Sequence, residues 1–185
     1  GQGTNQYTVA VLEKLSGMTF EDKRWDEAAS AYRRLYDVAP TKTGREDAMT
    51  GYVRATVAGG DGAKIAEMAA DVCGHDDAGA VALREAKYAW AGQLRAEGRS
   101  AEAVKLYKEL AKEVRTKEGS EAAYYVIEST FESGDMDKTE AAVFAFSERE
   151  PQAYWLARAF ILLGDVYVRK GDTFQALSLI HISEP

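Results

Sequence analysis

A short turn motif recurs along the chain at a nearly constant spacing. Four copies consist of a glycine followed by a polar residue, and in the fifth Lys23 and Arg24 occupy the same place. The motifs begin at Lys23, Gly60, Gly98, Gly134 and Gly171. Successive motifs are therefore 37, 38, 36 and 37 residues apart. A steady period of this length predicts a stack of similar helical units, because one such unit is too small to bury its apolar face alone.

The residues between the motifs favour helix. Proline, which interrupts helices, occurs only at Pro40, Pro151 and Pro185. Alanine is abundant and stands beside Glu, Lys, Arg and Leu, which are strong helix formers. We therefore predict an all-α fold of ten helices in five antiparallel hairpins. The expected outer helices are 25–38, 63–72, 101–115, 137–148 and 173 onward, and the expected groove-facing helices are 5–20, 45–58, 78–97, 120–133 and 152–169.

Small residues recur where two antiparallel helices have to approach closely. They are Ser16, Ala91 and Gly164 on the first helix of a pair and Ala28, Ala103 and Ala176 on the second. Large residues, expected to fill the space between one pair and the next, are Tyr32, Trp90, Tyr107 and Tyr167. Ile65 and Thr139 stand where the small residue belongs in the second and fourth repeats. Gly164 is thus predicted to be a close-contact position, whereas Gly119 is predicted to face solvent.

The last unit carries a recognisable pattern. Phe160 is followed by Leu163-Gly164, then by Tyr167, by Gly171-Asp172 and by Ala176. This pattern resembles the tetratricopeptide repeat, whose usual period is about 34 residues. The resemblance implies a right-handed α-solenoid of antiparallel hairpins within residues 1–176, the last unit being truncated. Its five units are expected at about 9–42, 46–82, 84–117, 120–153 and 157–176.

The same resemblance implies a concave groove lined by the first helix of each unit. The residues that it places there are Arg54, Tyr88, Arg95, Tyr124, Glu128, Phe131, Asp165 and Arg169. We therefore expect a protein-interaction scaffold that binds a peptide or helical partner. The alternatives are an accessory helical array of an enzyme whose catalytic domain lies outside this segment, and a structural spacer. Residues 151–176 also resemble large repeat proteins of bacterial envelopes, including TolA-binding-like coordinators, which favours the periplasm or envelope over the cytoplasm.

No constellation of residues indicates catalysis, a cofactor or a metal. The segment 59–64 is glycine-rich but lacks the Gly-Lys-Ser/Thr ending of a phosphate loop, and it coincides with the repeat turn. His75-Asp76-Asp77 is better explained as a loop with a helix cap, and Cys73 as a small buried residue. The net charge of −7, without a basic run, argues against nucleic-acid binding. No apolar stretch reaches the ~20 residues of a membrane span.

The two ends of the sequence have their own features. The chain opens with Gly1 and is expected to be a fragment of a longer protein. Residues 177–185, Leu-Ser-Leu-Ile-His-Ile-Ser-Glu-Pro, resemble a translated sequencing adapter. We expect this tail to be non-native, in which case His181 has no function; the alternative is a native apolar helix that ends at Pro185. The fifth unit should then leave Phe160, Leu163 and Tyr167 incompletely covered, so that self-association is expected.

Deletion of residues 177–185 tests the interpretation of the tail. The melting temperature of the first four units should stay nearly unchanged, because a foreign segment has no packing designed for it. Thermal unfolding followed by circular dichroism measures the effect. A large loss of stability would instead mean that the tail completes the fifth hairpin, whatever its origin.

Overall fold

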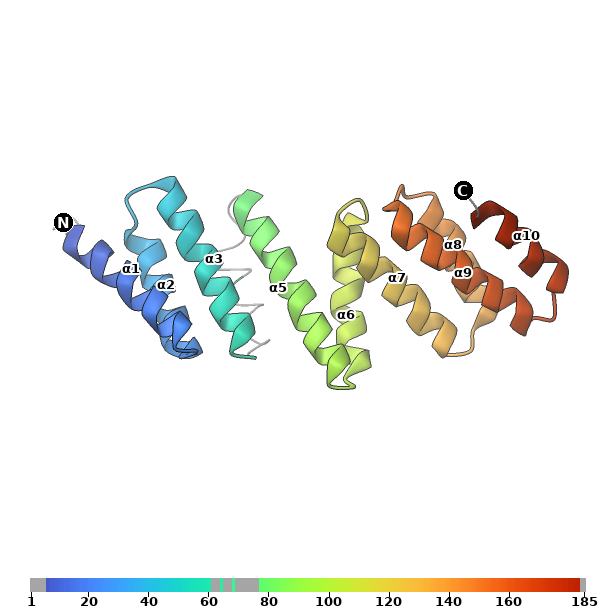
Figure 1. Ribbon diagram of the computed structural model, residues 1–185, viewed down its shortest axis with the longest axis horizontal. Coiled ribbons are helices and arrows are strands. Elements are labelled where there is room, and N and C mark those ends of the chain that lie inside the picture. The colour runs from blue at the N-terminus through green and yellow to red at the C-terminus, as the bar shows by residue number, and fades with distance from the viewer. Residues whose placement is uncertain (1–5, 61–63, 65–67, 69–76, 184–185) are drawn as a thin grey trace. The chain divides into compact units, whose positions relative to one another are not determined.

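The computed structural model describes residues 6–60, 64, 68 and 77–183. All regular secondary structure in these residues is helical (Figure 1), so the predicted all-α class is confirmed for the described part of the chain. The expected helix at 63–72 lies almost wholly outside the described residues, as do Ile65, Cys73, His75 and Asp76. None of the described helices is long and apolar enough to cross a membrane.

The helices follow the expected order, with bounds close to those predicted. They are α1 (Gln6–Glu21), α2 (Trp25–Val38), α3 (Lys42–Ala58), α5 (Asp77–Ala96), α6 (Ser100–Leu110), α7 (Lys117–Glu132), α8 (Met136–Ser147), α9 (Ala153–Arg169) and α10 (Thr173–Ser183). The expected helix 101–115 is shorter than predicted, since α6 ends at Leu110 and a 3₁₀ turn, Ala111–Glu113, follows.

The recurring motif is a recurring helix stop. Backbone φ is positive at all five positions: Lys23 (59°), Gly60 (74°), Gly98 (77°), Gly134 (88°) and Gly171 (78°). After α1, the N–H of Arg24 donates to the carbonyl oxygen of Thr19 at 2.8 Å, and that of Lys23 to Phe20 at 3.1 Å. These two bonds define a Schellman motif, which satisfies the last carbonyls of a helix and needs a left-handed residue. Glycine adopts that conformation without the Cβ clash that Lys23 has to tolerate.

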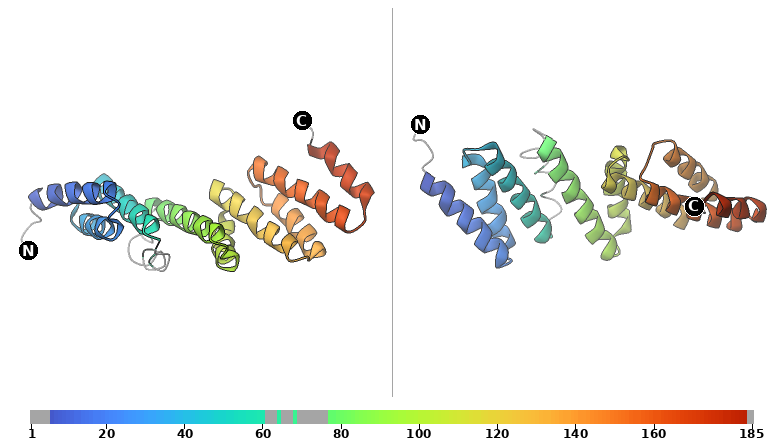
Figure 2. Two further views of the ribbon diagram at one scale, coloured as in Figure 1. Left: turned by 60° about the horizontal axis from the view of Figure 1, so that its bottom comes forward. Right: turned by 45° about the horizontal axis from the view of Figure 1, so that its top comes forward.

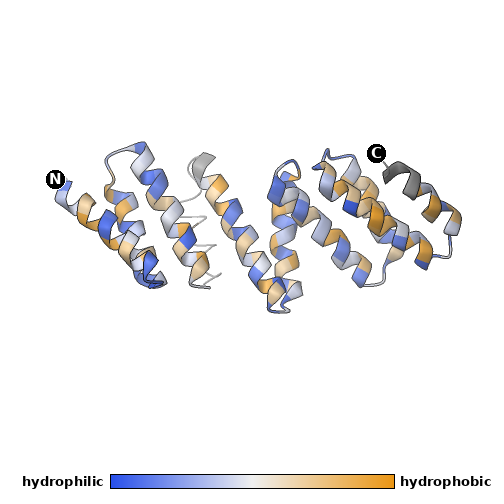
Figure 3. Cartoon of the chain, in the orientation of Figure 1, coloured by the Kyte–Doolittle hydropathy of each residue, from blue (hydrophilic) through white to orange (hydrophobic). Residues whose placement is uncertain are grey.

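The contacts divide the chain into two compact units, Gly1–Trp90 and Ala91–Pro185. In the first unit α2 packs against both α1 and α3, while α3 and α5 share a hydrophobic cluster that contains Val53 and Ala86. In the second unit each helix from α6 to α10 packs against the next, and α7 also contacts α9. Helices α9 and α10 run antiparallel (Figure 2), and Gly171 lies in the turn between them. Hydrophobic and hydrophilic residues are interspersed along the helices in Figure 3, as amphipathic helices require.

The small residues predicted at the close contacts are mostly buried. The exposed fraction is 0% for Ala28, 1% for Ser16, 0% for Ala91 and 1% for Ala103. Thr139 is also fully buried, and its hydroxyl donates to the carbonyl oxygen of Asp135 at 2.7 Å. A threonine is tolerated there because its polar group is satisfied within its own helix.

The C-terminal unit differs from expectation in two respects. Leu163 is 0% exposed and Tyr167 6%, so the prediction that both lack cover is wrong. Helix α10 continues past residue 176, and Leu179 packs partly buried against the main hydrophobic cluster of α7, α8 and α9. The segment 177–185 therefore contributes to the core of this unit at Leu179. Exposed apolar side chains lie instead on another side of α9, at Ile161 and Val168 (63% each), and on α10 at Phe174 (81%) and Leu177 (56%).

The predicted environments of two glycines are reversed. Gly119 is buried near the start of α7, and a Cβ at this position would overlap the carbonyl oxygen of Glu113. Gly164 has open space instead, since no atom of a neighbouring element lies within 4 Å of an added Cβ. The error arose because the role of a glycine depends on which neighbour is near, and the repeat pattern does not give the neighbour's distance.

The two glycines therefore predict opposite effects of the same substitution. Gly119→Ala should destabilise the second unit by roughly 1–3 kcal/mol, because the added methyl group overpacks against backbone. Gly164→Ala should be neutral or stabilise it by up to about 1 kcal/mol, because alanine has the higher helix propensity and meets no obstacle. Urea unfolding of the two variants and the wild type measures both. Equal destabilisation by both changes would contradict this assignment.

Candidate partner-binding surface

The eight residues predicted to line a groove are distributed over both units. Arg54 is exposed on α3 and Tyr88 half-buried on α5, both in the first unit. The other six belong to the second unit, with Arg95 in the last turn of α5. The remaining five are Tyr124, Glu128 and Phe131 on α7 and Asp165 and Arg169 on α9. Six of the eight predicted residues therefore lie in one compact unit, the second.

Arg95 is the centre of this set. Its Nη2 donates to Oε1 of Glu128 at 2.9 Å, and its guanidinium carbon lies 3.9 Å from the ring centroid of Tyr125. The side chain of Arg95 remains 43% exposed, and that of Glu128 22%. Helix α5 ends at Ala96, just before the left-handed turn at Gly98, and Arg95 stands in its last turn. Arg95 is thus fixed by a charge and a ring, with part of its guanidinium open to solvent.

A row of aromatic rings continues from this point. Tyr107 and Tyr125 have ring centroids 5.1 Å apart, and Tyr124 lies 5.8 Å from Tyr125 and 5.5 Å from Trp155. Arg158 covers the other side, with its guanidinium carbon 4.9 Å from the Tyr124 ring. Arginine over an aromatic face is stabilised by the ring quadrupole, typically by about 0.5–1 kcal/mol at exposed sites. Two arginines therefore bracket the tyrosine pair of α7.

A cavity of about 220 Å³ lies beside Arg95. It is lined by Arg95, Ser100, Ala103, Val104, Tyr107, Tyr125, Glu128, Ser129 and Glu132. Pockets for whole small molecules usually measure about 300–1,000 Å³. The volume at this site is smaller and suits a single side chain of a partner. The lining offers two carboxylates, one guanidinium and two phenol rings.

Burial and charge act together on the ionisable groups. Burial raises the pKa of Tyr125 above its ordinary value of 10.0, as does the hydrogen bond to Glu121, whereas Arg95 lowers it. Burial likewise raises the pKa of Tyr107, again against the effect of Arg95. For Arg95 itself, burial acts to lower the pKa, but Tyr125 and Glu128 outweigh it and raise the pKa overall. At neutral pH the cavity therefore holds neutral tyrosines beside a charged arginine.

Two of the predicted groove residues are part of the core. Tyr124 is 5% exposed and Phe131 9%, and both belong to the main hydrophobic cluster of the unit. The Tyr124 hydroxyl donates to Oε2 of Glu128 at 3.1 Å, and the guanidinium carbon of Arg169 lies 4.1 Å from the Phe131 ring. These contacts correct the expectation that both rings offer exposed apolar surface. They hold Glu128 and Arg169 in position instead.

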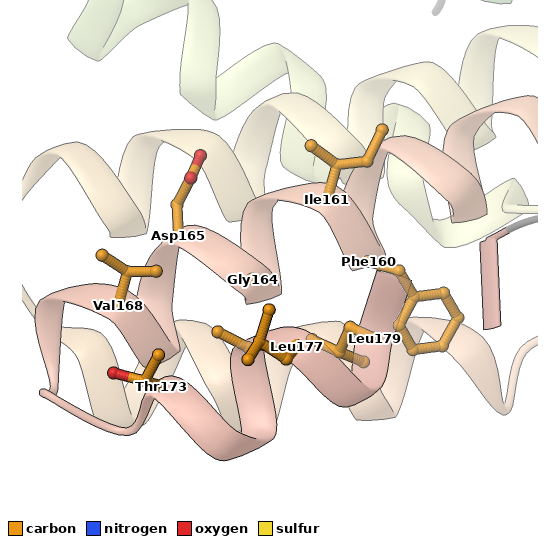
Figure 4. A pocket seen from close by; sticks show the side chains of 9 residues that line it. Phe160, Ile161, Gly164, Asp165, Val168, Thr173, Leu177 and Leu179 are labelled. Atoms are coloured by element: carbon orange, nitrogen blue, oxygen red, sulfur yellow. The ribbon is translucent and has the colours of Figure 1, made fainter. Parts of the chain in front are cut away.

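Asp165 belongs to a different place. It lines a cavity of about 320 Å³ between α9 and α10, together with apolar residues that include Ile161, Val168 and Leu177 (Figure 4). The missing side chain at Gly164 contributes to this space. The structure therefore separates Asp165 from the Arg95 network.

Sequence reasoning did not select Tyr125 and Arg158, and it treated Tyr107 only as a packing residue. A signal was present, because Tyr125 directly follows Tyr124, and Arg158 follows Tyr154 by one helical turn. Residues four apart, such as Tyr154 and Arg158, lie on one helical face, whereas the adjacent Tyr124 and Tyr125 do not. What the spacing could not show is that both arginines meet tyrosines of a different helix.

The remaining chemistry of the described residues is limited. No group of three or more His, Cys, Asp or Glu residues in that part of the chain is placed to hold a metal ion. No family model matches the sequence, and the comparison with curated proteins gives no match.

Replacement of Arg95 tests the electrostatics of this surface. In Arg95→Met the pKa of Tyr125 should rise further above 10.0, because the cation that favours the phenolate is gone. A tyrosine with a raised folded-state pKa stabilises the fold below its unfolded pKa, and this contribution is lost as the pH rises through the folded pKa. The variant should therefore lose more stability on the alkaline side. NMR titration of ring-labelled tyrosine measures the shift, with Arg115→Met as a control, and an unchanged Tyr125 pKa would contradict the contact.

Proposed function

We propose that the chain is a tetratricopeptide-type array, folded as a right-handed α-solenoid, and that it acts as a protein-interaction scaffold. The proposal is supported by the five turns of like geometry, by the helix pairs within each unit and by the buried small residues between them. An envelope or periplasmic location, suggested by the resemblance of residues 151–176, is part of the same proposal. An enzyme's accessory array and a spacer are the alternatives.

The observation that carries the proposal is the side-chain-sized cavity at Arg95. Its walls are the rings of Tyr107 and Tyr125, and its charges are Arg95 against Glu128 and Glu132. An aromatic wall with an excess of carboxylates favours a lysine or arginine side chain, whose methylene stem packs on the rings while its head pairs with acid. The net charge of −7 also attracts a basic partner before contact. We therefore propose a basic peptide or helix as the partner.

A peptide library displayed on phage tests this function without a known partner. Panning against the purified chain should enrich sequences that contain lysine or arginine beside apolar residues. For a selected synthetic peptide, Glu132→Gln should weaken binding at least about tenfold, since a few contacts usually carry most of the affinity. Fluorescence anisotropy measures the dissociation constants.

Glu148→Gln is the matched control, because it removes the same charge from an exposed site on the same unit. It should leave peptide affinity nearly unchanged. Equal weakening by both variants would mean that only the overall charge attracts the peptide. Failure to select any peptide would favour the spacer.

A further inference from the structure

Arg158, in the second turn of α9, lies against a set of aromatic rings. Its guanidinium carbon is 4.9 Å from the ring centroid of Tyr124 on α7 and 5.6 Å from that of Trp155. Its Nη1 donates to the hydroxyl oxygen of Tyr154 at 3.4 Å. Tyr124 and Trp155 are buried in the core, whereas Arg158 itself is exposed. The guanidinium is therefore held by rings of two neighbouring helices and remains open to solvent.

No carboxylate in the described part of the chain pairs with Arg158. The groups that raise its pKa are the hydroxyls of Tyr154 and Tyr124. Glu128, which also contacts Tyr124, is already engaged through both oxygens. Its Oε1 accepts from Arg95 at 2.9 Å, and its Oε2 accepts from the Tyr124 hydroxyl at 3.1 Å. Of the two arginines beside the tyrosine pair of α7, Arg95 is thus neutralised by a carboxylate and Arg158 is not.

The sign of the charge at this position is reversed relative to the three preceding repeats. Thirteen residues before their turn glycines stand Asp47, Glu85 and Glu121, whereas the same count back from Gly171 gives Arg158. Glu121 is 9% exposed, and its Oε1 accepts from the hydroxyl of Tyr125 at 3.0 Å. A position that holds a buried, hydrogen-bonded acid in the fourth repeat therefore holds an exposed cation in the fifth.

A guanidinium in this setting suits a carboxylate. Arginine presents five N–H donors in a planar fork, and after the bond to Tyr154 enough remain to bind both oxygens of one carboxylate. Because the rings already hold the side chain, little conformational freedom is lost on binding. Recognition of phosphate instead uses clusters of arginine, and the neighbouring Arg95 is already paired with Glu128.

We propose that Arg158 binds the carboxylate of an aspartate or glutamate in the partner peptide, beside the basic residue that the Arg95 cavity accepts. The inference rests on the proposed peptide-binding function, and it adds a second contact that fixes the direction of the peptide. The ring centroids of Tyr125 and Tyr124 are 5.8 Å apart, and Arg158 lies 4.9 Å from the Tyr124 ring, so its guanidinium is within about 11 Å of the Tyr125 wall of the cavity. An extended peptide rises about 3.3 Å per residue, so the acidic residue should stand about two to four positions from the basic one.

Panning the phage-displayed library against two forms of the chain tests the inference. Against the wild type, the selected sequences should carry Asp or Glu at one fixed offset, about two to four residues from the Lys or Arg. Against Arg158→Gln the basic residue should still be selected, because the Arg95 cavity is intact. The acidic residue at that offset should no longer be enriched, because its partner is gone.

A double-mutant cycle with one selected peptide measures the contact itself. Replacement of the peptide's acidic residue by its amide should weaken binding to the wild type about tenfold and should have little effect on binding to Arg158→Gln. Arg158→Lys keeps the charge but not the fork of two donors, so it should recover only part of the affinity. Fluorescence anisotropy gives the dissociation constants.

Two controls keep the test specific. Lys138→Gln removes the same charge from an exposed site on α8 of the same unit, and it should change neither the selection nor the cycle. Circular dichroism checks that each variant is folded. Arg158→Met, whose side chain still packs on the rings without a charge, replaces Arg158→Gln if that variant unfolds.

The outcomes separate this contact from the proposed function. Selection of basic residues without an acidic residue at a fixed offset would overturn the Arg158 contact and leave the proposed function standing. Selection of acidic residues without basic ones would support the contact and overturn the role of the Arg95 cavity. Equal weakening by the amide on both proteins, or by Lys138→Gln, would show that Arg158 does not bind the carboxylate. Failure to select any peptide would overturn both proposals.

Discussion

The first helix of each pair has more apolar surface than its antiparallel partner can cover. In α9, Leu163 and Val166 are fully buried, whereas Ile161 and Val168 on another side are 63% exposed. The same contrast separates Val11 of α1 from its buried equivalent Ala159 in α9. Burial at a given position therefore depends on whether another pair lies beside it. This need for a neighbour explains the packing of the core and the exposed faces of α1 and α9.

The left-handed turns make the packing periodic. Because the first helix of each described pair ends at the same kind of stop, residues counted back from the stop meet similar surroundings. Alanine twelve residues before the turn is the clearest case, being buried at Ala48, Ala86, Ala122 and Ala159. A larger side chain at this position would hold two first helices apart. The left-handed turn and the alanine twelve residues before it therefore together determine how closely two neighbouring first helices can pack.

The candidate surface arises where one position departs from this periodicity. Three residues before the turn, the other repeats carry Phe20, Val57, Phe131 and Val168, but the third repeat carries Arg95. A charge at a position that is otherwise apolar needs compensation. Tyr125 supplies a ring face and Glu128 a carboxylate, and the polar cavity beside them follows from that exchange. The candidate surface thus originates in a local change of the packing pattern.

The sequence by itself determined the all-helical class, the five turns and the burial of Ala28, Ser16, Ala91 and Ala103, because these depend on local conformational preference and on periodicity. It also selected Arg95 and Glu128. It could not show that Arg95 meets Tyr125, that Tyr124 and Phe131 are buried, or that Gly119 and not Gly164 is the crowded glycine. Those facts depend on which residue of another helix lies opposite and at what distance. Spacing along one helix indicates which residues share a face, whereas only tertiary packing decides what covers that face.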